Sequence, residues 1–247
     1  MPLIFLTNLQ EIDMSVAEKY APESLHEAVI PSVATANRIN GYATGGLNGH
    51  IILYGPNGTG KSTVAHLLPT AISGDDAFIE PKSLEELLAM KDLKGYLKQS
   101  AHVAQVLNGS KYFLVYDEAD AVKGNFARFW TAVDYCGSDV MMIFTTNNPM
   151  AIPASIRSRS DEIAFPALTP QQFLPRAQFM LQAEGVKLPN AQVLHYLTQI
   201  QHTPDIRKYC RKVDEIIYLA KSSLPLPAAP SVAANQPQIK VVAGKKK

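Results

Sequence analysis

The sequence predicts an α/β fold with a mostly parallel five-stranded sheet, followed by a small helical domain. Short apolar strands alternate with amphipathic helices from His50 to Phe165, and two of the strands are near-continuous apolar runs, as expected when both faces are covered by helices. From Pro166 onward the strand pattern stops. The candidate strands are residues 51–54, 77–79, 112–116, 140–145 and 162–165.

The helical part is predicted to contain three helices, at about 170–184, 190–201 and 204–223. The last has its apolar residues on one helical stripe, with Thr203 as the expected N-cap and Pro204 at the first helical position. Three regions are therefore expected: an α/β domain at 1–166, a helical domain at 167–223, and a flexible tail rich in Pro and Ala at 224–247.

The composition indicates a soluble cytoplasmic protein with no membrane contact. Apolar residues make up 47% of the 247, enough for a substantial core. The 23 Lys and Arg nearly balance the 22 Asp and Glu, so nucleic-acid binding would need a local cluster of charge. Cys136 and Cys210 lack metal-site spacing and indicate a reducing compartment. Neither a secretory signal nor a membrane-length apolar run is apparent.

The clearest functional signal is a segment that fits G-x-x-x-x-G-K-[ST] without a mismatch. Its glycines let backbone N–H groups face phosphates, and the helix expected at 62–71 adds its positive N-terminal end. We expect Lys61 to reach the terminal phosphates of ATP and Ser62 to supply an oxygen to Mg²⁺. A chance glycine-rich turn is disfavoured because a strand precedes the motif. The predicted nucleotide-binding residues are Gly55, Pro56, Asn57, Gly58, Thr59, Gly60, Lys61, Ser62 and Thr63.

Two acidic residues follow the apolar strand at 112–116. Asp117 can hold magnesium, directly or through water, and Glu118 can orient and deprotonate an attacking water. Taken alone, the pattern also fits an ordinary strand followed by a polar turn. Together with the phosphate motif, it favours ATP hydrolysis over nucleotide binding alone.

These residues, with four further segments, resemble the AAA+ ATPases and, within them, the subunits of sliding-clamp loaders of the phage type and the replication factor C small-subunit type. The resemblance covers roughly residues 18–223. The segment E-K-Y-A-P-E-S-L at 18–25 looks like the clamp-loader motif E-K-Y-R-P-x-x-L, which packs beside adenine, and Ala21 replaces the usual Arg. The resemblance implies that Tyr20 and Pro22 line an adenine pocket. A capped loop before a helix is the alternative.

Three more segments carry residues that the resemblance places near the reacting phosphate. Asn147, in T-T-N-N, is similar to sensor 1, although Asn-Pro can also mark a turn. Arg159, in S-I-R-S-R-S, looks like the arginine finger of the S-R-C motif, which the resemblance implies is supplied to the neighbouring subunit's site. Ser160 stands in place of Cys, and Arg157 is a competitor for the role. Arg207 is similar to the sensor-2 arginine. A surface Arg is the alternative for both arginines, but the helix macrodipole disfavours a cation at 207 unless an anion is near.

The resemblance implies an oligomer with other AAA+ subunits that uses ATP and Mg²⁺ to load a sliding clamp on primed double-stranded DNA during replication. Clamp-loader subunits usually have a third, collar domain, and this sequence ends before one. The alternatives are an AAA+ ATPase that remodels another protein or protein–DNA complex, and a non-hydrolysing switch, which Glu118 and Arg159 disfavour. The lysines at a possible DNA-facing surface could equally form a solvated face with nearby carboxylates: Lys82, Lys91, Lys94 and Lys98, with Glu85, Glu86 and Asp92.

Overall fold

The computed structural model describes residues 14–122, 124–202 and 204–222. Its sheet has five strands in the order β2-β3-β4-β1-β5, and every neighbouring pair is parallel. The predicted α/β fold is confirmed, and β5 begins two residues earlier than expected, at Ser160. The strands are β1 (His50–Tyr54), β2 (Phe78–Ile79), β3 (Tyr112–Tyr116), β4 (Val140–Thr146) and β5 (Ser160–Ala164).

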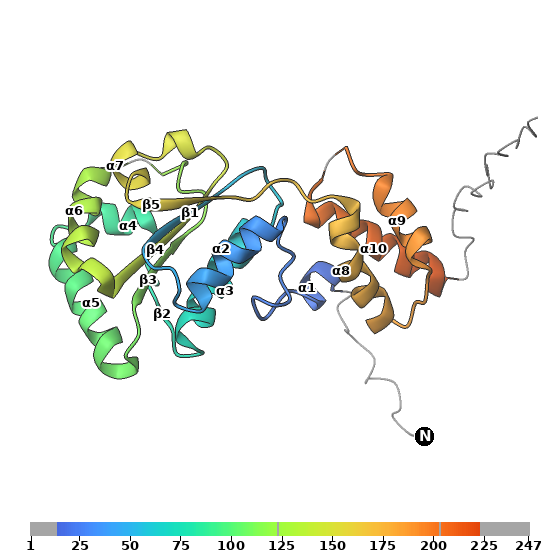
Figure 1. Cartoon of the computed structure of the whole chain (residues 1–247), viewed down its shortest axis with the longest axis horizontal. Coiled ribbons are helices and arrows are strands. Elements are labelled where there is room, and N and C mark those ends of the chain that lie inside the picture. Colours follow the sequence, from blue (N-terminus) through green and yellow to red (C-terminus); the bar gives the residue numbers. More distant parts are fainter. Residues whose placement is uncertain (1–13, 123, 203, 223–247) are drawn as a thin grey trace, which may run out of the picture.

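Helices cover both faces of this sheet (Figure 1). Alternate strand residues point to opposite layers, so Ile51 and Leu53 belong to one core cluster and Ile52 to the other. One layer contains α2 (Val33–Ala43) and α3 (Lys61–Ser73). The other contains α4 (Leu84–Ala89), α5 (Leu93–Asn108), α6 (Phe126–Cys136) and α7 (Ala154–Arg157), with the short 3-10 turns η1 (Gly137–Asp139) and η2 (Pro149–Ala151) nearby. Burial on both faces explains the continuous apolar runs of β3 and β4.

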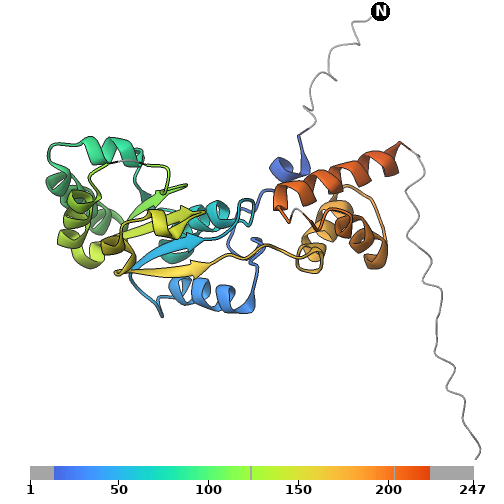
Figure 2. The ribbon, with the colours of Figure 1, turned by 90° about the horizontal axis from the view of Figure 1, so that it is seen from above.

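A third core cluster lies in the helical group at the other end of the molecule (Figure 1). It is built by α8 (Pro170–Ala183), α9 (Asn190–Thr198) and α10 (Ile206–Lys221). The short N-terminal helix α1 (Val16–Lys19) joins this group, and Figure 2 shows it beside α10. The Val16 backbone N–H donates to Asp214 Oδ1 at 2.9 Å. In the described part of the chain, no helix has the length and apolarity needed to cross a membrane.

The predicted start of the last helix was wrong. The helix α10 begins at Ile206 rather than Pro204, and its N-cap is Asp205, whose carboxylate accepts a hydrogen bond from Arg207 N at 2.8 Å. An Asp at this position satisfies an otherwise unpaired N–H of the first turn, so the helix starts after it. Thr203 and the expected tail at 224–247 lie outside the described residues.

The Glu184 carboxylate also ties the N-terminal segment to the helical group. Glu184, just after α8, accepts hydrogen bonds from Lys19 Nζ at 2.5 Å, Tyr20 Oη at 2.7 Å and Lys221 Nζ at 2.5 Å. The bonds from Lys19, Lys221 and Tyr20 lower the pKa of Glu184 to about 2. The segment that leads into the α/β region is therefore held against α8 and α10.

Candidate nucleotide site

The predicted phosphate site lies at the edge of the sheet where the strands have their carboxyl ends. The phosphate loop follows β1, Asp117 and Glu118 follow β3, and Asn147 follows β4, which lies between the other two strands. Parallel pairing therefore gathers segments that are far apart in sequence. A cavity of about 120 Å³ at this edge is lined by Asn57, Gly58, Thr59, Gly60, Lys61, Ser62, Thr63, Glu118, Thr145, Thr146, Asn147, Ile206 and Arg207.

Two glycines of the loop are required by close packing. At Gly55, φ is 148° and a Cβ atom would lie 2.2 Å from the carbonyl oxygen of Phe165. At Gly58, φ is 70° and a Cβ would lie 2.0 Å from Asp205 Oδ1. The Ile206 N–H also donates to the Gly58 carbonyl at 2.8 Å. The start of α10 is thus fitted against the phosphate loop, and any larger residue at 58 would push it away.

Lys61 is held inside the loop at the first position of α3. Its side chain is buried, and Nζ donates to the carbonyl oxygens of Gly55 at 2.8 Å and Pro56 at 2.7 Å and to Asn147 Oδ1 at 3.1 Å. Burial lowers the pKa of Lys61, while the nearby carboxylates, led by Asp120, oppose that shift. The structure therefore brings the phosphate loop and the residue after β4 into direct contact through Lys61 and Asn147.

Asp117 is held as a carboxylate by Ser62 and by two residues that the sequence did not point to, His66 and Thr145. Its Oδ1 accepts from Thr145 Oγ1 at 2.9 Å, and its Oδ2 lies 2.9 Å from His66 Nε2. Burial alone would raise the pKa of Asp117, but hydrogen bonds from His66, Ser62 and Thr145 outweigh it and hold the pKa at about 2. An ionised carboxylate beside the Ser62 hydroxyl is a suitable oxygen donor set for Mg²⁺.

Glu118 has an unusual backbone conformation. Its φ is 49°, and among the described residues it is the only non-glycine residue with a positive φ. The Glu118 N–H donates to Thr145 Oγ1 at 3.2 Å, so this hydroxyl links the backbone of Glu118 to the carboxylate of Asp117. A left-handed conformation costs on the order of 1 kcal/mol in a residue with a side chain and is concentrated at functional sites. The turn places Glu118, but not Asp117, in the cavity lining.

Arg207 reaches the same cavity from the first turn of α10. Its side chain is exposed, and within the described ranges no salt bridge involves its guanidinium group. The helical group therefore contributes a cation to a site whose other lining residues, apart from Ile206, belong to the α/β region. That position is suitable for contact with an anion bound in the phosphate loop.

The two residues expected to line an adenine pocket, Tyr20 and Pro22, lie outside the lining of the 120 Å³ cavity. Tyr20 packs with the helical cluster, edge to face with Phe179 at 5.8 Å between ring centroids. The same segment does reach the phosphate loop farther along, because the Val29 carbonyl lies 3.7 Å from where a Cβ of Gly60 would be. Adenine binding by Tyr20 and Pro22 remains a prediction.

Arg159 lies at the amino ends of the strands, opposite the phosphate loop at their carboxyl ends. It precedes β5, which runs parallel to β1 with Ser160 opposite His50 and Ala164 opposite Tyr54. At about 3.3 Å per residue, the length of these strands separates Arg159 from the phosphate loop by roughly 13 Å or more. Arg157 is half-buried, with Nη1 3.6 Å from Glu162 Oε1, whereas Arg159 is exposed. Neither arginine lines the 120 Å³ cavity.

Three of the four lysines near α4 and α5 contact aromatic residues. Lys82 Nζ donates to Tyr96 Oη at 2.9 Å, and Lys94 Nζ and Lys98 Nζ lie 3.4 Å and 5.4 Å from the ring centroid of Tyr135. The carboxylates Glu86 and Asp92 serve as helix-capping groups for α4 and α5. These contacts are compatible with either of the two interpretations of the lysines, and DNA contact remains a prediction.

Known proteins that are similar to this chain include an ATPase family and several clamp-loader subunits. Residues 51–167 match the family described as the ATPase family associated with various cellular activities (AAA). The chain is 27% identical to the replication factor C small subunit 2 of Pyrobaculum arsenaticum over 175 residues, which is 69% of this chain and 54% of the relative. It is 24% identical to the sliding-clamp-loader large subunit of Enterobacteria phage T4 over 219 residues, or 85% and 66% of the two chains.

A replication factor C large subunit of Methanococcus maripaludis is 31% identical over 143 residues, which is 56% of this chain and 27% of that subunit. The chain thus spans about half the length of the replication factor C small subunit. Among solved structures, the Thermotoga maritima RuvB Holliday junction branch migration motor aligns with a TM-score of 0.60 at 19% identity, over 82% of this chain and 67% of that chain. This likeness supports the fold alone.

Proposed function

Because the chain carries an AAA ATPase domain distantly homologous to replication factor C and phage clamp-loader subunits, we propose that it hydrolyses ATP as a clamp-loader-like subunit. The observation that carries the proposal is the convergence of four elements on one cavity. The phosphate loop, Glu118, Asn147 and Arg207 come from different parts of the sequence and all line it.

The residues present fit MgATP. The backbone N–H groups of residues 57–60 and the Lys61 ammonium would hold the phosphates, and the ionised Asp117 and the Ser62 hydroxyl would hold Mg²⁺. The metal would neutralise charge on the β- and γ-phosphates. Glu118 orients and deprotonates the attacking water, and Asn147 positions the γ-phosphate or that water. Arg207 reports the occupancy of the site to the helical group, which acts as a lid.

The position of Arg159 supports an oligomer. Its side chain is exposed at the edge of the sheet opposite its own phosphate loop, so it is suited to a neighbouring subunit's site and not to its own. A guanidinium group at that site would stabilise charge spread over the transferring phosphoryl group. The pairing of Arg157 with Glu162 favours Arg159 for this role.

The proposed partners are other AAA+ subunits, a sliding clamp and primed double-stranded DNA. They are tested together by measuring the ATPase rate of the chain alone, with primed DNA, and with primed DNA plus the cognate clamp. We expect marked stimulation only by the last combination. Stimulation by DNA without the clamp, or by a different protein target, would favour another AAA+ remodelling role. Absence of hydrolysis above a Lys61→Ala control under every condition would contradict the ATPase assignment itself.

Arg207→Ala is expected to weaken binding of a slowly hydrolysed ATP analogue by roughly tenfold or more, since a charge-assisted hydrogen bond contributes about 1.5–3 kcal/mol. ADP binding should change less, because the proposed contact is to the γ-phosphate. Titration with both nucleotides measures the difference. Lys208→Ala is the matched control, since it removes a neighbouring exposed cation that does not line the cavity. Equal losses for ATP analogue and ADP would show that Arg207 is structural or contacts only the shared phosphates.

A further inference from the structure

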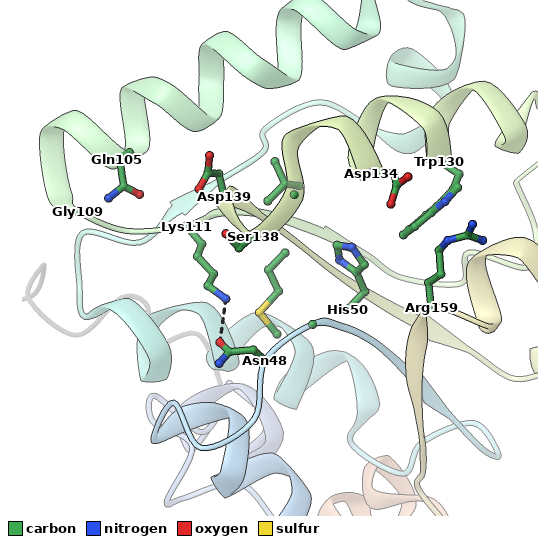
Figure 3. Close-up of a pocket in the computed structure, with 14 residues that line it drawn as sticks. Asn48, His50, Gln105, Gly109, Lys111, Trp130, Asp134, Ser138, Asp139 and Arg159 are labelled. Carbon is green, nitrogen blue, oxygen red and sulfur yellow. Dashed lines mark hydrogen bonds between the residues drawn. The ribbon is translucent and has the colours of Figure 1, made fainter.

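A second and larger cavity, of about 800 Å³, opens at the amino ends of the strands (Figure 3). The nucleotide site lies at their carboxyl ends. The larger cavity lies where β1, β3, β4 and β5 begin. Its lining includes His50, Lys111, Trp130, Asp134 and Arg159. Figure 3 shows His50, Trp130 and Arg159 grouped at one end of this cavity.

The guanidinium group of Arg159 rests on the ring of Trp130. Its Cζ lies 5.3 Å from the ring centroid, within the range of a cation–π interaction, and Nη1 donates to the carbonyl oxygen of Ser155 at 3.0 Å. Trp130, in contrast, is buried in α6, with only 6% of its surface exposed. An exposed, flexible side chain is therefore held on a buried, rigid one.

Trp130 is itself held by its neighbours. The His50 ring packs edge to face against it, with centroids 5.2 Å apart at 87°. His50 is oriented by its Nδ1, which accepts from the Met142 N–H at 3.1 Å. Burial, aided by the charge of Lys111, lowers the pKa of His50 to about 4, although Asp134 opposes the shift. His50 is therefore neutral near pH 7 and does not repel the guanidinium group.

Burying the indole N–H of Trp130 has an energetic cost that a purely apolar side chain would not have. Its Nε1 is buried and has no hydrogen-bond partner among the described residues. A buried indole N–H usually finds a partner, and leaving one unpaired is unfavourable. Phe or Leu could fill a core position on α6 without that cost. The broad aromatic face, which binds cations more strongly than that of Phe, is a reason for Trp at this position.

We propose that Trp130 is a positioning residue for Arg159, holding the guanidinium group ready for a neighbouring subunit's nucleotide site. The inference rests on the proposed role of Arg159 in trans. A free arginine side chain has many rotamers, and ordering it only at the moment of reaction would weaken its effect. Stacking on a fixed ring limits those rotamers before the subunits meet.

The kinetic test compares Trp130→Leu with Trp130→Phe in the assembled, stimulated ATPase. Trp130→Leu should lower kcat about three- to tenfold, the range of a cation–π contact, with little change in KM for ATP. Trp130→Phe, which keeps an aromatic face, should recover most of that rate. In an Arg159→Ala background, Trp130→Leu should cause no further loss. Equal losses in both backgrounds, or a Phe variant as slow as the Leu variant, would overturn the positioning role. Absence of ATPase in the parent protein would overturn the proposed function and this role together.

A spectroscopic test does not depend on turnover. Trp130 is the single tryptophan of the sequence, so the protein's indole emission comes from this ring alone. Arg159→Ala should change the emission maximum or intensity in the nucleotide-free protein, while Arg157→Ala should leave it near that of the parent. Circular dichroism of both variants is the control for folding. Unchanged emission in Arg159→Ala would show that the stacked contact is not made in solution, and would overturn the proposal.

Discussion

Arg159→Ala protein is expected to bind ATP like the parent and to hydrolyse it more slowly by a factor on the order of 10³ or more, as for other arginine fingers. The reason is geometric. Arg159 precedes β5 while the phosphate loop follows β1, and the two strands are parallel, so a subunit's own pocket is left intact by the change. Nucleotide titration and steady-state ATPase assays with DNA, clamp and any partner subunit measure the two quantities separately.

Mixing Arg159→Ala protein with Glu118→Gln protein should partly restore hydrolysis. In a mixed oligomer, some sites would combine an intact Glu118 from the first variant with an intact Arg159 from the second. If the mixture never exceeds the sum of the two variants, while sedimentation shows that they assemble together, then action in trans is wrong. Arg157→Ala is the matched control, because it removes the same charge two residues away. It should slow hydrolysis less than Arg159→Ala, since Arg157 pairs with Glu162.

Glu118→Gln is expected to retain ATP binding and to reduce hydrolysis by roughly 10²–10⁴, the usual contribution of a general base. Glutamine has nearly the same shape and can keep the backbone turn and the Glu118 N–H bond to Thr145, so the change removes the basic carboxylate alone. Single-turnover hydrolysis and binding of a slowly hydrolysed analogue distinguish the two effects.

Asp120→Asn provides a charge-matched control for Glu118→Gln. Asp120 lies two residues farther along, accepts from Thr146 Oγ1 at 2.6 Å and does not line the cavity. An asparagine oxygen can keep that bond, so we expect less than about a tenfold loss of rate, well below general-base catalysis. A Glu118→Gln variant as fast as the parent, or an Asp120→Asn variant as slow as Glu118→Gln, would remove Glu118 from the proposed mechanism.

Local patterns in the sequence were sufficient to predict the sheet and the phosphate loop. Continuous apolar runs identify strands buried on both faces, and the glycine-rich motif carries its own geometry, because Gly55 has no space for a Cβ and Lys61 follows at a set spacing. The positions of Asp117, Glu118 and Asn147, just after β3 and β4, were predictable as well. Parallel strands bring their carboxyl ends to one edge, so residues just after them must lie close together.

The tertiary structure decided which residues of different elements contact one another, because such contacts leave no periodic pattern in the sequence. Thr145 in β4 and His66 in α3 both hold the Asp117 carboxylate. The sequence signals for them were weak: Thr145 lies at the end of a strand, and His66 is four residues beyond Ser62 on the same helix face. The stacking of Arg159 on Trp130 joins the start of β5 to α6. Such contacts depend on how layers pack and on the register between strands. The sequence by itself therefore determined the strands and the chemistry at their ends, while packing decided which side chains hold that chemistry in place and which edge of the sheet Arg159 occupies.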